Sequence, residues 1–522
     1  MGTRGAGWPD RLARPLLPAA PGSAVAGEPR DRYAKRVAAA HRPGREVLLP
    51  RLARGLAWIA GLAPLLGCSG AEDRPPPTRT LVWLVIDTLR ADALGAYGCT
   101  ERGETDAPPS PNLDRLAAEG FLFERAYAAA PWTVPSLATQ LSGRYPFDHG
   151  ANRLLEPLPE RLVTLPQVLS RQGWRSVGVT TNFVTLGRYG FDRGFERFDD
   201  SLALGHEGSY GPQAVDRLLE LSDGLGGPEV RRFLWLLLFE PHFRYEAHAG
   251  LRFGRGFGTR RAEAPYAGPL RGSEPLAELR ASLAGGRLSA EDLEFLRALY
   301  QSEAAAADQA FGRLRSGLEQ RGLWDEAWVL ASADHGEELG EQGWLGHTVR
   351  LSEALVRVPL LVRGPRSAGL APRRIDVPVS QVDLFATALD FAGLPAAARP
   401  PVESRSLWPL LVGAEVEPRR WLYLFSRFDP VLAAGVASTQ SAHLWGAVDG
   451  RGLTKWIVDR GPAAPGEAAV RARWFDLSAA PGAEREVPWT AAQVEAAWRL
   501  RGLLPEPLGE HSGSEPLPVD AR

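Results

Sequence analysis

The sequence predicts an α/β fold, in which helices cover both faces of a mostly parallel central sheet and a small C-terminal α+β subdomain follows. Continuous apolar runs of strand length alternate with helical patterns over residues 80–395, as in sheets whose parallel strands are joined by helices. Two of these runs end directly on an acid, Asp87 and Asp334. Beyond about residue 396, short strand-like pieces rich in Trp and Tyr replace this alternation. Residues 396–505 are therefore expected to form the subdomain.

The elements of the first half follow from apolar periodicity and from residues that begin or end helices. Gly120 and Gly143 are expected helix stops, Thr164 is a plausible helix cap, and Pro135 suits a first helical turn. Strands are expected at Leu81–Ile86, Ser176–Thr180 and Phe233–Phe239, and helices at Asn112–Gly120, Pro135–Leu141 and Leu165–Gln172.

The second half continues the same alternation. A long helix is expected at Glu291–Arg321, strands at Ala327–Ala333 and Val358–Val362, and a helix at Gln381–Gly393. Gly250–Gly286 carries no readable motif and is expected to line a pocket as a loop. The subdomain strands are expected at Trp421–Phe425, Leu444–Val448, Lys455–Val458 and Ala472–Phe475.

Composition excludes several functions. The chain has 522 residues, enough for one large core with an appended subdomain, and a net charge of −2 predicts no nucleic-acid partner. Its two cysteines make a disulfide framework improbable.

The N-terminal region resembles an exported bacterial lipoprotein. Residues 47–67 combine a basic start with a short apolar run, and Leu65-Leu66-Gly67-Cys68 resembles a lipobox. Cys68 is the expected lipidation site, residues 68–79 a Pro-rich tether, and the cell envelope the expected location, with the membrane reached through this anchor. Alternatives are a short buried helix or an uncleaved anchor. Residues 1–46 fit a disordered or mis-annotated extension, and residues 506–522 a loose tail.

Several motifs stand in a fixed order along the chain. The segment Trp132–Arg144 reads W-T-V-P-S-L-A-T-Q-L-S-G-R; V-I-D-T-L-R-A-D-A-L-G-A-Y-G precedes it, and A-D-H-G-E-E-L-G-E-Q-G-W-L-G-H and W-F-D-L-S-A-A-P-G-A-E-R-E follow. From about Thr80 to about Pro488 these blocks resemble the sulfatase family of the alkaline-phosphatase superfamily. The resemblance implies that family's three-layer sandwich and its ester-cleaving chemistry.

The resemblance assigns roles to particular residues. It implies Asp87, Asp334 and His335 as metal ligands, with Thr133 as nucleophile and further ligand. His242, in F-E-P-H-F-R-Y, matches the family's substrate-pocket histidine. His347 lies where related phosphoethanolamine transferases keep an active-site histidine. Both are expected to bind substrate and take part in catalysis.

Remaining assignments stay open between function and structure. Arg144 either contacts the substrate anion or forms a salt bridge. Thr133 could instead be only a helix N-cap. Arg90 is expected to pair with Asp92, and His149 to serve the structure.

The departures from the family pattern concern sulfate handling. Thr133 stands where the family has a Cys or Ser that is oxidised to formylglycine, so no formylglycine is expected. Thr88 replaces the second of two paired acids, and Leu137 replaces the Arg that supports formylglycine. Around Thr181–Phe183 the family's Lys and His are absent.

These residue types suit transfer of a phosphoryl or sulfuryl group. Two carboxylates, an imidazole and a hydroxyl can hold a divalent metal, here zinc, manganese or calcium. A Thr hydroxyl needs a metal or base to become a good nucleophile. The sequence thus predicts a metal-dependent hydrolase of a small-molecule, glycan or lipid ester, with phosphoester favoured over sulfate ester. The alternatives are a phospho-group transferase and a non-catalytic surface binding protein.

Overall fold

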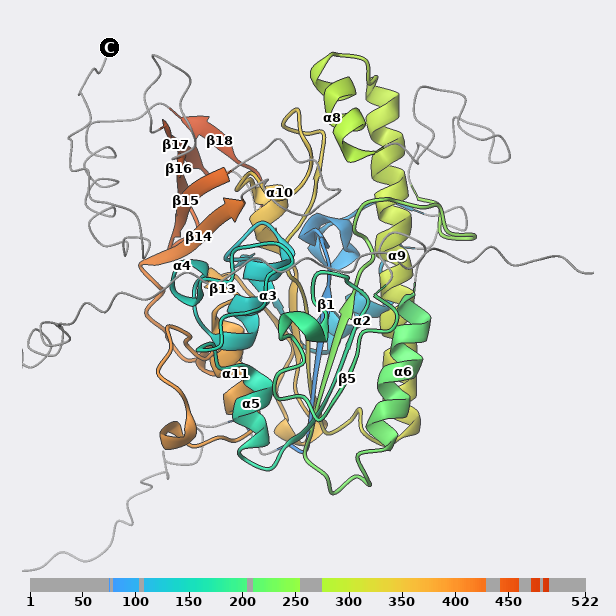
Figure 1. Ribbon diagram of the computed structural model, residues 1–522, viewed down its shortest axis with the longest axis vertical. Coiled ribbons are helices and arrows are strands. Elements are labelled where there is room, and N and C mark those ends of the chain that lie inside the picture. The colour runs from blue at the N-terminus through green and yellow to red at the C-terminus, as the bar shows by residue number, and fades with distance from the viewer. Residues whose placement is uncertain are drawn as a thin grey trace, which may run out of the picture. The chain divides into compact units, whose positions relative to one another are not determined.

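An eight-stranded sheet forms the centre of residues 80–395 in the computed structural model (Figure 1). Its strand order is β12-β2-β11-β7-β1-β6-β4-β5, and only β11 runs antiparallel to its neighbours. The strands are β1 (Thr80–Ile86), β2 (Phe121–Phe123), β4 (Arg175–Thr180), β5 (Arg197–Asp199), β6 (Arg232–Leu238), β7 (Ala327–Ala333), β11 (Leu360–Arg363) and β12 (Arg373–Ile375). The predicted mostly parallel sheet is confirmed.

The three middle strands are apolar because both faces of the sheet are covered. Every residue of β1, β6 and β7 is buried. Ile86, the last residue of β1, pairs with Leu238 on one side and Ala333 on the other. The carboxyl ends of these strands therefore lie at the same edge, where the functional residues of open α/β sheets gather.

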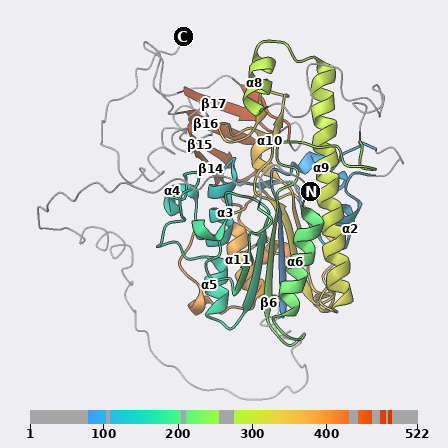
Figure 2. The same cartoon turned by 45° about the vertical axis from the view of Figure 1, so that its right-hand side comes forward.

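Helices form a layer on each face of this sheet, which gives the expected three-layer sandwich (Figures 1 and 2). One layer holds α2 (Pro111–Glu119), α6 (Gly211–Asp223) and α9 (Ala290–Gln320), and the other α3 (Thr133–Ser142), α5 (Leu165–Ser170) and α11 (Asp383–Phe391). Thr164 forms the predicted cap of α5, in a capping box with Gln167. None of the helices in the described ranges is long and apolar enough to cross a membrane.

Shorter elements connect these layers. The helices are η1 (Ala91–Ala93), η2 (Gly95–Tyr97), α4 (Pro146–His149), η3 (Gly187–Tyr189), α8 (Leu276–Ala284), α10 (Glu353–Val356), η4 (Arg366–Ala368), η5 (Ala396–Ala398) and α12 (Trp408–Leu411). A three-stranded sheet joins β10 (Arg357–Val358), β3 (Ala126–Tyr127) and β13 (Val379–Ser380), and a two-stranded one joins β8 (Glu338–Leu339) and β9 (Leu345–Gly346).

The C-terminal region contains a five-stranded antiparallel sheet of β14 (Trp421–Phe428), β15 (Ala442–Asp449), β16 (Thr454–Asp459), β17 (Arg471–Asp476) and β18 (Arg485–Val487). Apolar side chains of this sheet, among them Leu422, Leu424 and Ile457, pack against Leu351 and Leu355 of residues 80–395. The two regions thus share a small core of their own.

Three expectations are corrected. Helix α3 begins at Thr133, two residues before Pro135, and Trp132 is its N-cap, so Thr133 is not a cap. The expected strand Val358–Val362 is two strands in different sheets, because Pro359 has no N–H to donate and separates β10 from β11. Gly250–Gly286 is not all loop, since α8 lies within it.

The structure describes residues 75, 78–102, 108–203, 210–253, 275–428, 442–459, 471–478 and 482–487. The predicted extension (1–46), signal (47–67), lipidation site Cys68 and tail (506–522) lie outside these residues, as does most of the tether (68–79).

Candidate active site

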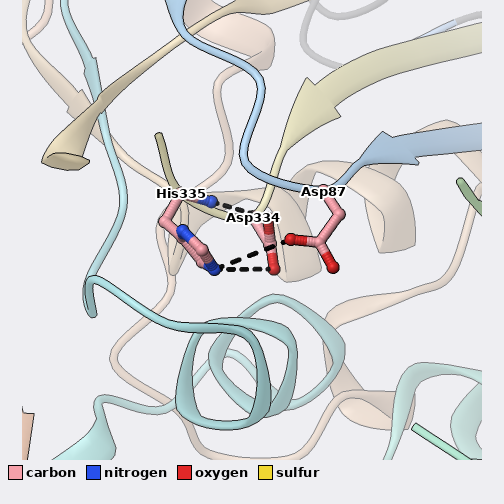
Figure 3. A group of neighbouring side chains, drawn as sticks. All are labelled: Asp87, Asp334 and His335. Carbon is pink, nitrogen blue, oxygen red and sulfur yellow. Dashed lines mark hydrogen bonds and ion pairs between the residues drawn. The ribbon is translucent and has the colours of Figure 1, made fainter. Parts of the chain in front are cut away.

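Asp87, Asp334 and His335 meet at the carboxyl edge of the central sheet (Figure 3). Asp87 directly follows β1, and Asp334 directly follows β7, its parallel neighbour. One ligand atom from each of the three residues lies within 4.8 Å of the other two, and all three side chains are buried. The strand pairing thus unites residues that lie 247 positions apart in the sequence.

The imidazole of His335 directs a lone pair at both carboxylates. Its Nδ1 lies 2.9 Å from the Gly336 carbonyl, which can only accept, so Nδ1 carries the hydrogen. Burial lowers the pKa of His335 to about 4, which leaves the ring neutral at neutral pH with a lone pair on Nε2. That Nε2 lies 3.3 Å from Asp334 Oδ2 and 3.8 Å from Asp87 Oδ1. One imidazole nitrogen and two carboxylate oxygens therefore converge.

This arrangement fits a divalent metal. Asp87 Oδ1 and Asp334 Oδ2 are buried and have no hydrogen-bond partner among the described residues. Burial, and then the nearby charge of Asp334, raise the pKa of Asp87 well above its ordinary value. Unpaired buried carboxylates are costly unless a cation offsets them. The mixed nitrogen and oxygen set suits zinc or manganese better than calcium, which prefers oxygen ligands alone.

The second oxygen of each carboxylate is held by a protein donor. Asn182 Nδ2 donates a short hydrogen bond to Asp87 Oδ2. The backbone N–H groups of Thr88 and His335 donate to Asp334 Oδ1 at 3.1 and 2.8 Å. These donors orient the carboxylates and leave one oxygen of each directed at His335, as expected for ligand-orienting groups in metal sites.

Backbone strain accompanies this orientation. Thr88, which follows Asp87, has a φ of 55°, a left-handed conformation rare for a β-branched residue. Such residues cost on the order of 1–3 kcal/mol and persist only when their surroundings hold them. Here the Thr88 N–H donates to Asp334 and its carbonyl accepts from the Tyr300 hydroxyl at 2.8 Å. The strain is thus located beside a predicted ligand.

Thr133 lies next to the cluster, at the first residue of α3. Its Oγ1 is 3.4 Å from His335 Nε2, the same nitrogen that faces the carboxylates. In the first turn of the same helix, the Ser136 hydroxyl donates to the Asp334 carbonyl at 2.6 Å and so ties the helix to the end of β7. The N-terminus of a helix also favours an anion. The predicted nucleophile is therefore placed where a negatively charged group would be bound.

Two further histidines extend the cluster. The ring centroid of His347 lies 4.6 Å from that of His335, and that of His242 lies 4.9 Å from His347. The Nδ1–H of His347 donates to the buried Glu337 at 3.0 Å, which fixes the ring orientation. His242 stacks on Phe239, with 4.4 Å between centroids. The structure thus brings all three predicted histidines together.

Arg144 is not brought to the cluster. It lies just beyond the far end of α3, about 15 Å along the helix from Thr133. Its guanidinium forms an ion pair with Asp148 at 2.6 Å and donates to the Pro401 carbonyl at 2.7 Å. Of the two predicted roles for Arg144, the salt bridge is the one observed, and the contact with the substrate anion has no support in this geometry.

Positions that handle sulfate in the family are apolar or neutral here. Leu137 is fully buried in the main hydrophobic core, where no charge could be accommodated without a partner. Asn182, in the segment where the Lys and His are missing, donates to Asp87 instead.

The predicted structural pairs are present: Arg90 binds Asp92 at 2.7 Å, and the buried His149 accepts from the Ala151 N–H at 2.9 Å.

Sequence reasoning missed two contributors. Asn182 follows β4, whose neighbour β6 pairs with β1, so its place just past a parallel strand was an available signal. Arg280 of α8 donates to the Leu345 carbonyl at 2.6 Å and to the His347 carbonyl at 3.4 Å. No sequence signal pointed to Arg280, because α8 lies in a segment without a motif.

An α/β sandwich with an acid–histidine cluster and a hydroxyl at its carboxyl edge is the architecture of a class of hydrolases. The sulfatase family model matches residues 79–394, more than half of the chain. The chain belongs to the sulfatase family and is a hydrolase of ester bonds.

Individual relatives are distant. The chain is 26% identical to the multifunctional alkaline phosphatase superfamily protein PehA of Trinickia caryophylli, over 66% of this chain and 78% of that protein. It is 28% identical to the steryl-sulfatase of Mus musculus, over 71% of this chain and 70% of that protein. Among solved structures, the phosphonate monoester hydrolase of Agrobacterium radiobacter matches with a TM-score of 0.61 and 21% identity, covering 81% of this chain and 95% of that one. The last likeness supports the fold alone.

Proposed function

We propose that this protein hydrolyses a phosphoester by way of a covalent intermediate on Thr133, with a divalent metal held by Asp87, Asp334 and His335. One observation carries the proposal: Thr133 Oγ1 lies 3.4 Å from the same His335 nitrogen that faces two unpaired buried carboxylate oxygens. A hydroxyl beside a cluster of this kind suits nucleophilic attack on phosphorus or sulfur.

The chain's own groups account for two displacement steps. In the first, the oxygen of Thr133 bonds to phosphorus, the Thr133 hydroxyl proton passes to solvent, and the bond from phosphorus to the leaving oxygen breaks as that oxygen takes a proton from an outer histidine. In the second, the oxygen of a water molecule bonds to phosphorus, the bond from phosphorus to the Thr133 oxygen breaks, a proton of the water restores the Thr133 hydroxyl, and the phosphate product leaves. A metal at Asp87, Asp334 and His335 would supply positive charge that lowers the pKa of the hydroxyl and neutralises the oxygens of the transferred group.

His347 and His242 bind the transferred group and supply the proton to the leaving oxygen. His347 is the better placed of the two for the proton transfer, since its ring centroid lies 4.6 Å from that of His335 and its orientation is fixed by Glu337. A well-placed general acid contributes about 10²- to 10⁴-fold to the rate. A second metal held by His242 and His347 is the alternative use of these rings.

Three features support phosphoester over sulfate ester. Threonine at position 133 cannot become formylglycine, Leu137 is a buried hydrocarbon, and Asn182 replaces the cationic pair. Solved structures of similar fold include two phosphonate monoester hydrolases, from Agrobacterium radiobacter and Silicibacter pomeroyi. Other relatives include a steryl-sulfatase and an N-acetylgalactosamine-6-sulfatase, so sulfate esters are the competing substrate class.

We further propose that the enzyme acts in the bacterial cell envelope, anchored through a diacylated Cys68. The support is the basic and apolar segment that ends in Leu-Leu-Gly-Cys. Metabolic labelling with radioactive palmitate, compared between the full chain and Cys68→Ala, tests the anchor. Equal labelling of the two would refute it.

The activity is tested with the purified full chain on three esters that share one leaving group. These are 4-nitrophenyl phosphate, bis(4-nitrophenyl) phosphate and 4-nitrophenyl sulfate, each with added zinc, manganese or calcium. We expect the fastest turnover on a phosphoester, loss of activity in Thr133→Ala, and partial retention in Thr133→Ser. A sulfate ester cleaved clearly faster than both phosphoesters would overturn the substrate preference, and activity retained in Thr133→Ala would overturn the nucleophile.

A further inference from the structure

His347 is followed by a segment, Thr348–Glu353, that lies against the C-terminal sheet. At its start, the Thr348 carbonyl accepts from the Ser426 hydroxyl of β14 at 2.6 Å. The Thr348 N–H donates to the Pro131 carbonyl at 3.0 Å, two residues before Thr133. The first residue after His347 is therefore bonded to the C-terminal sheet on one side and to the nucleophile's segment on the other.

Lys455 of β16 holds the other end of this segment. Its ammonium group is fully buried and meets three acceptors: the Leu351 carbonyl at 3.0 Å, Glu353 Oε1 at 3.1 Å, and Glu484 in a short contact. A lysine has three N–H donors on a compact head, so each donor has one acceptor here. Glu353 also accepts from the buried Tyr127 hydroxyl at 3.3 Å.

The backbone beside His347 is strained. Thr348 has a φ of 92°, outside the range that β-branched residues favour. Such a conformation persists only where the surroundings fix it. The fixing contacts are the ones to Ser426, Pro131 and, further along, Lys455. Without them the segment would relax, and the His347 imidazole would move with it.

We propose that Lys455 and Ser426 are positioning residues, through which the C-terminal sheet holds His347 in place for proton transfer. This inference rests on the proposed function, because His347 acts on the leaving oxygen only there. Neither residue lies in the cluster itself; both bind backbone carbonyls of the segment that carries His347. A catalytic group displaced by about 1 Å can lose as much as about 10²-fold in rate.

A loss of activity in Lys455→Met would not by itself test this. Removing the ammonium leaves Glu353 and Glu484 buried without their cation, which destabilises a protein strongly. Ser426→Ala removes one hydroxyl and is the milder variant. Each is therefore measured alone and together with His347→Ala, using folded protein quantified by circular dichroism.

The test is a double-mutant cycle on the 4-nitrophenyl ester that the full chain cleaves fastest. Residues that act through His347 lose their effect once the imidazole is gone, whereas independent residues keep it. We expect kcat to fall in Lys455→Met by about 10-fold, and by no more than in His347→Ala, and about threefold in Ser426→Ala, with KM changed less. In the His347→Ala background we expect both losses to shrink to less than about twofold.

A leaving-group comparison gives a second readout. With the corresponding phenyl ester, whose leaving oxygen needs the proton more, both single variants should lose more activity than with the 4-nitrophenyl ester. Trp456→Phe is the matched control, since Trp456 is the strand neighbour of Lys455, is buried, and packs in a different cluster from Leu351. It should lower the melting temperature without changing kcat or the leaving-group dependence.

The outcomes separate the two proposals. If His347→Ala is fully active on both esters, the catalytic role of His347 fails, and this inference with it. If His347→Ala is impaired but Lys455→Met and Ser426→Ala lose the same factor in both backgrounds, only the positioning role fails. If Lys455→Met does not fold, Ser426→Ala decides alone by the same criterion.

Discussion

The inner cluster of Asp87, Asp334 and His335 and the outer pair of His347 and His242 are held in different ways. Asp87 and Asp334 extend two paired strands whose every residue is buried, so the central sheet fixes them. His347 lies outside any strand or helix, on a segment held by hydrogen bonds to residues distant in the sequence, such as Ser426, Arg280 and Pro131. Substitutions in the inner cluster should therefore abolish activity, whereas substitutions that affect the outer pair should lower activity only in part.

The largest effect is expected from Asp87→Asn. Removing this charge should abolish metal binding, measured by elemental analysis, and lower activity by more than about 10⁴-fold. The metal-free variant should nevertheless have a higher melting temperature than the metal-free wild type, because burial and the Asp334 charge raise the pKa of Asp87 in the absence of a cation. A metal-free Asp87→Asn variant that is less stable than the metal-free wild type would contradict the inference that two buried carboxylates destabilise each other without a cation. Asp148→Asn, which changes a carboxylate in an exposed ion pair, is the control.

A smaller loss is expected from His347→Ala. It should lower kcat by about 10²-fold or more on a phenyl ester and less on a 4-nitrophenyl ester, while metal content stays at the wild-type level. If the variant loses the metal together with its activity, His347 is a metal ligand and belongs to the inner cluster.

Asn182→Ala should weaken the inner cluster without destroying it. Asn182 donates to the oxygen of Asp87 that faces away from His335, so its loss should lower metal affinity about 10- to 100-fold. Titration of the metal-free protein with zinc measures this. Activity at saturating zinc should recover most of the wild-type value, and failure to recover would mean that Asn182 acts on the substrate.

The smallest effect concerns stability alone. Burial lowers the pKa of His149 from 6.5 to about 3, so the unfolded chain binds the extra proton first as the pH falls. The stability that His149 contributes is complete above about pH 6.5 and is lost progressively toward pH 3, by up to about 1.4 kcal/mol per pH unit. His149→Gln should therefore show a shallower decline of unfolding free energy between pH 6 and pH 4. An unchanged slope would show that His149 is not buried in its neutral form.

The strand-end positions of Asp87 and Asp334 follow from local sequence, whereas their assignment, together with His335, as metal ligands comes from the resemblance to the sulfatase family. An apolar run that ends on an acid predicts both the strand and the position of the carboxylate at the end of that strand, as at Asp87 and Asp334. Residues whose role depends on tertiary contacts were not predicted. Arg280 lies in a segment without a motif, and Asn182 was considered only because the family's Lys and His are missing from its segment. Arg144 shows the converse, since a motif residue pairs with Asp148 away from the cluster. Pro359 split a predicted strand because apolar periodicity does not report sheet membership.

The central claim is that Thr133 carries the transferred group. The most direct measurement is mass spectrometry of the full chain after rapid acid quenching during turnover of a 4-nitrophenyl phosphoester. We expect a phosphoryl adduct on the peptide that contains Thr133. The adduct should be absent in Thr133→Ala, and it should be stronger in His347→Ala if the outer histidines also assist the attack of water. Two results would contradict the assignment of Thr133 as nucleophile. One is the absence of an adduct on Thr133 in an active enzyme that shows a burst of product release, and the other is an adduct on another residue.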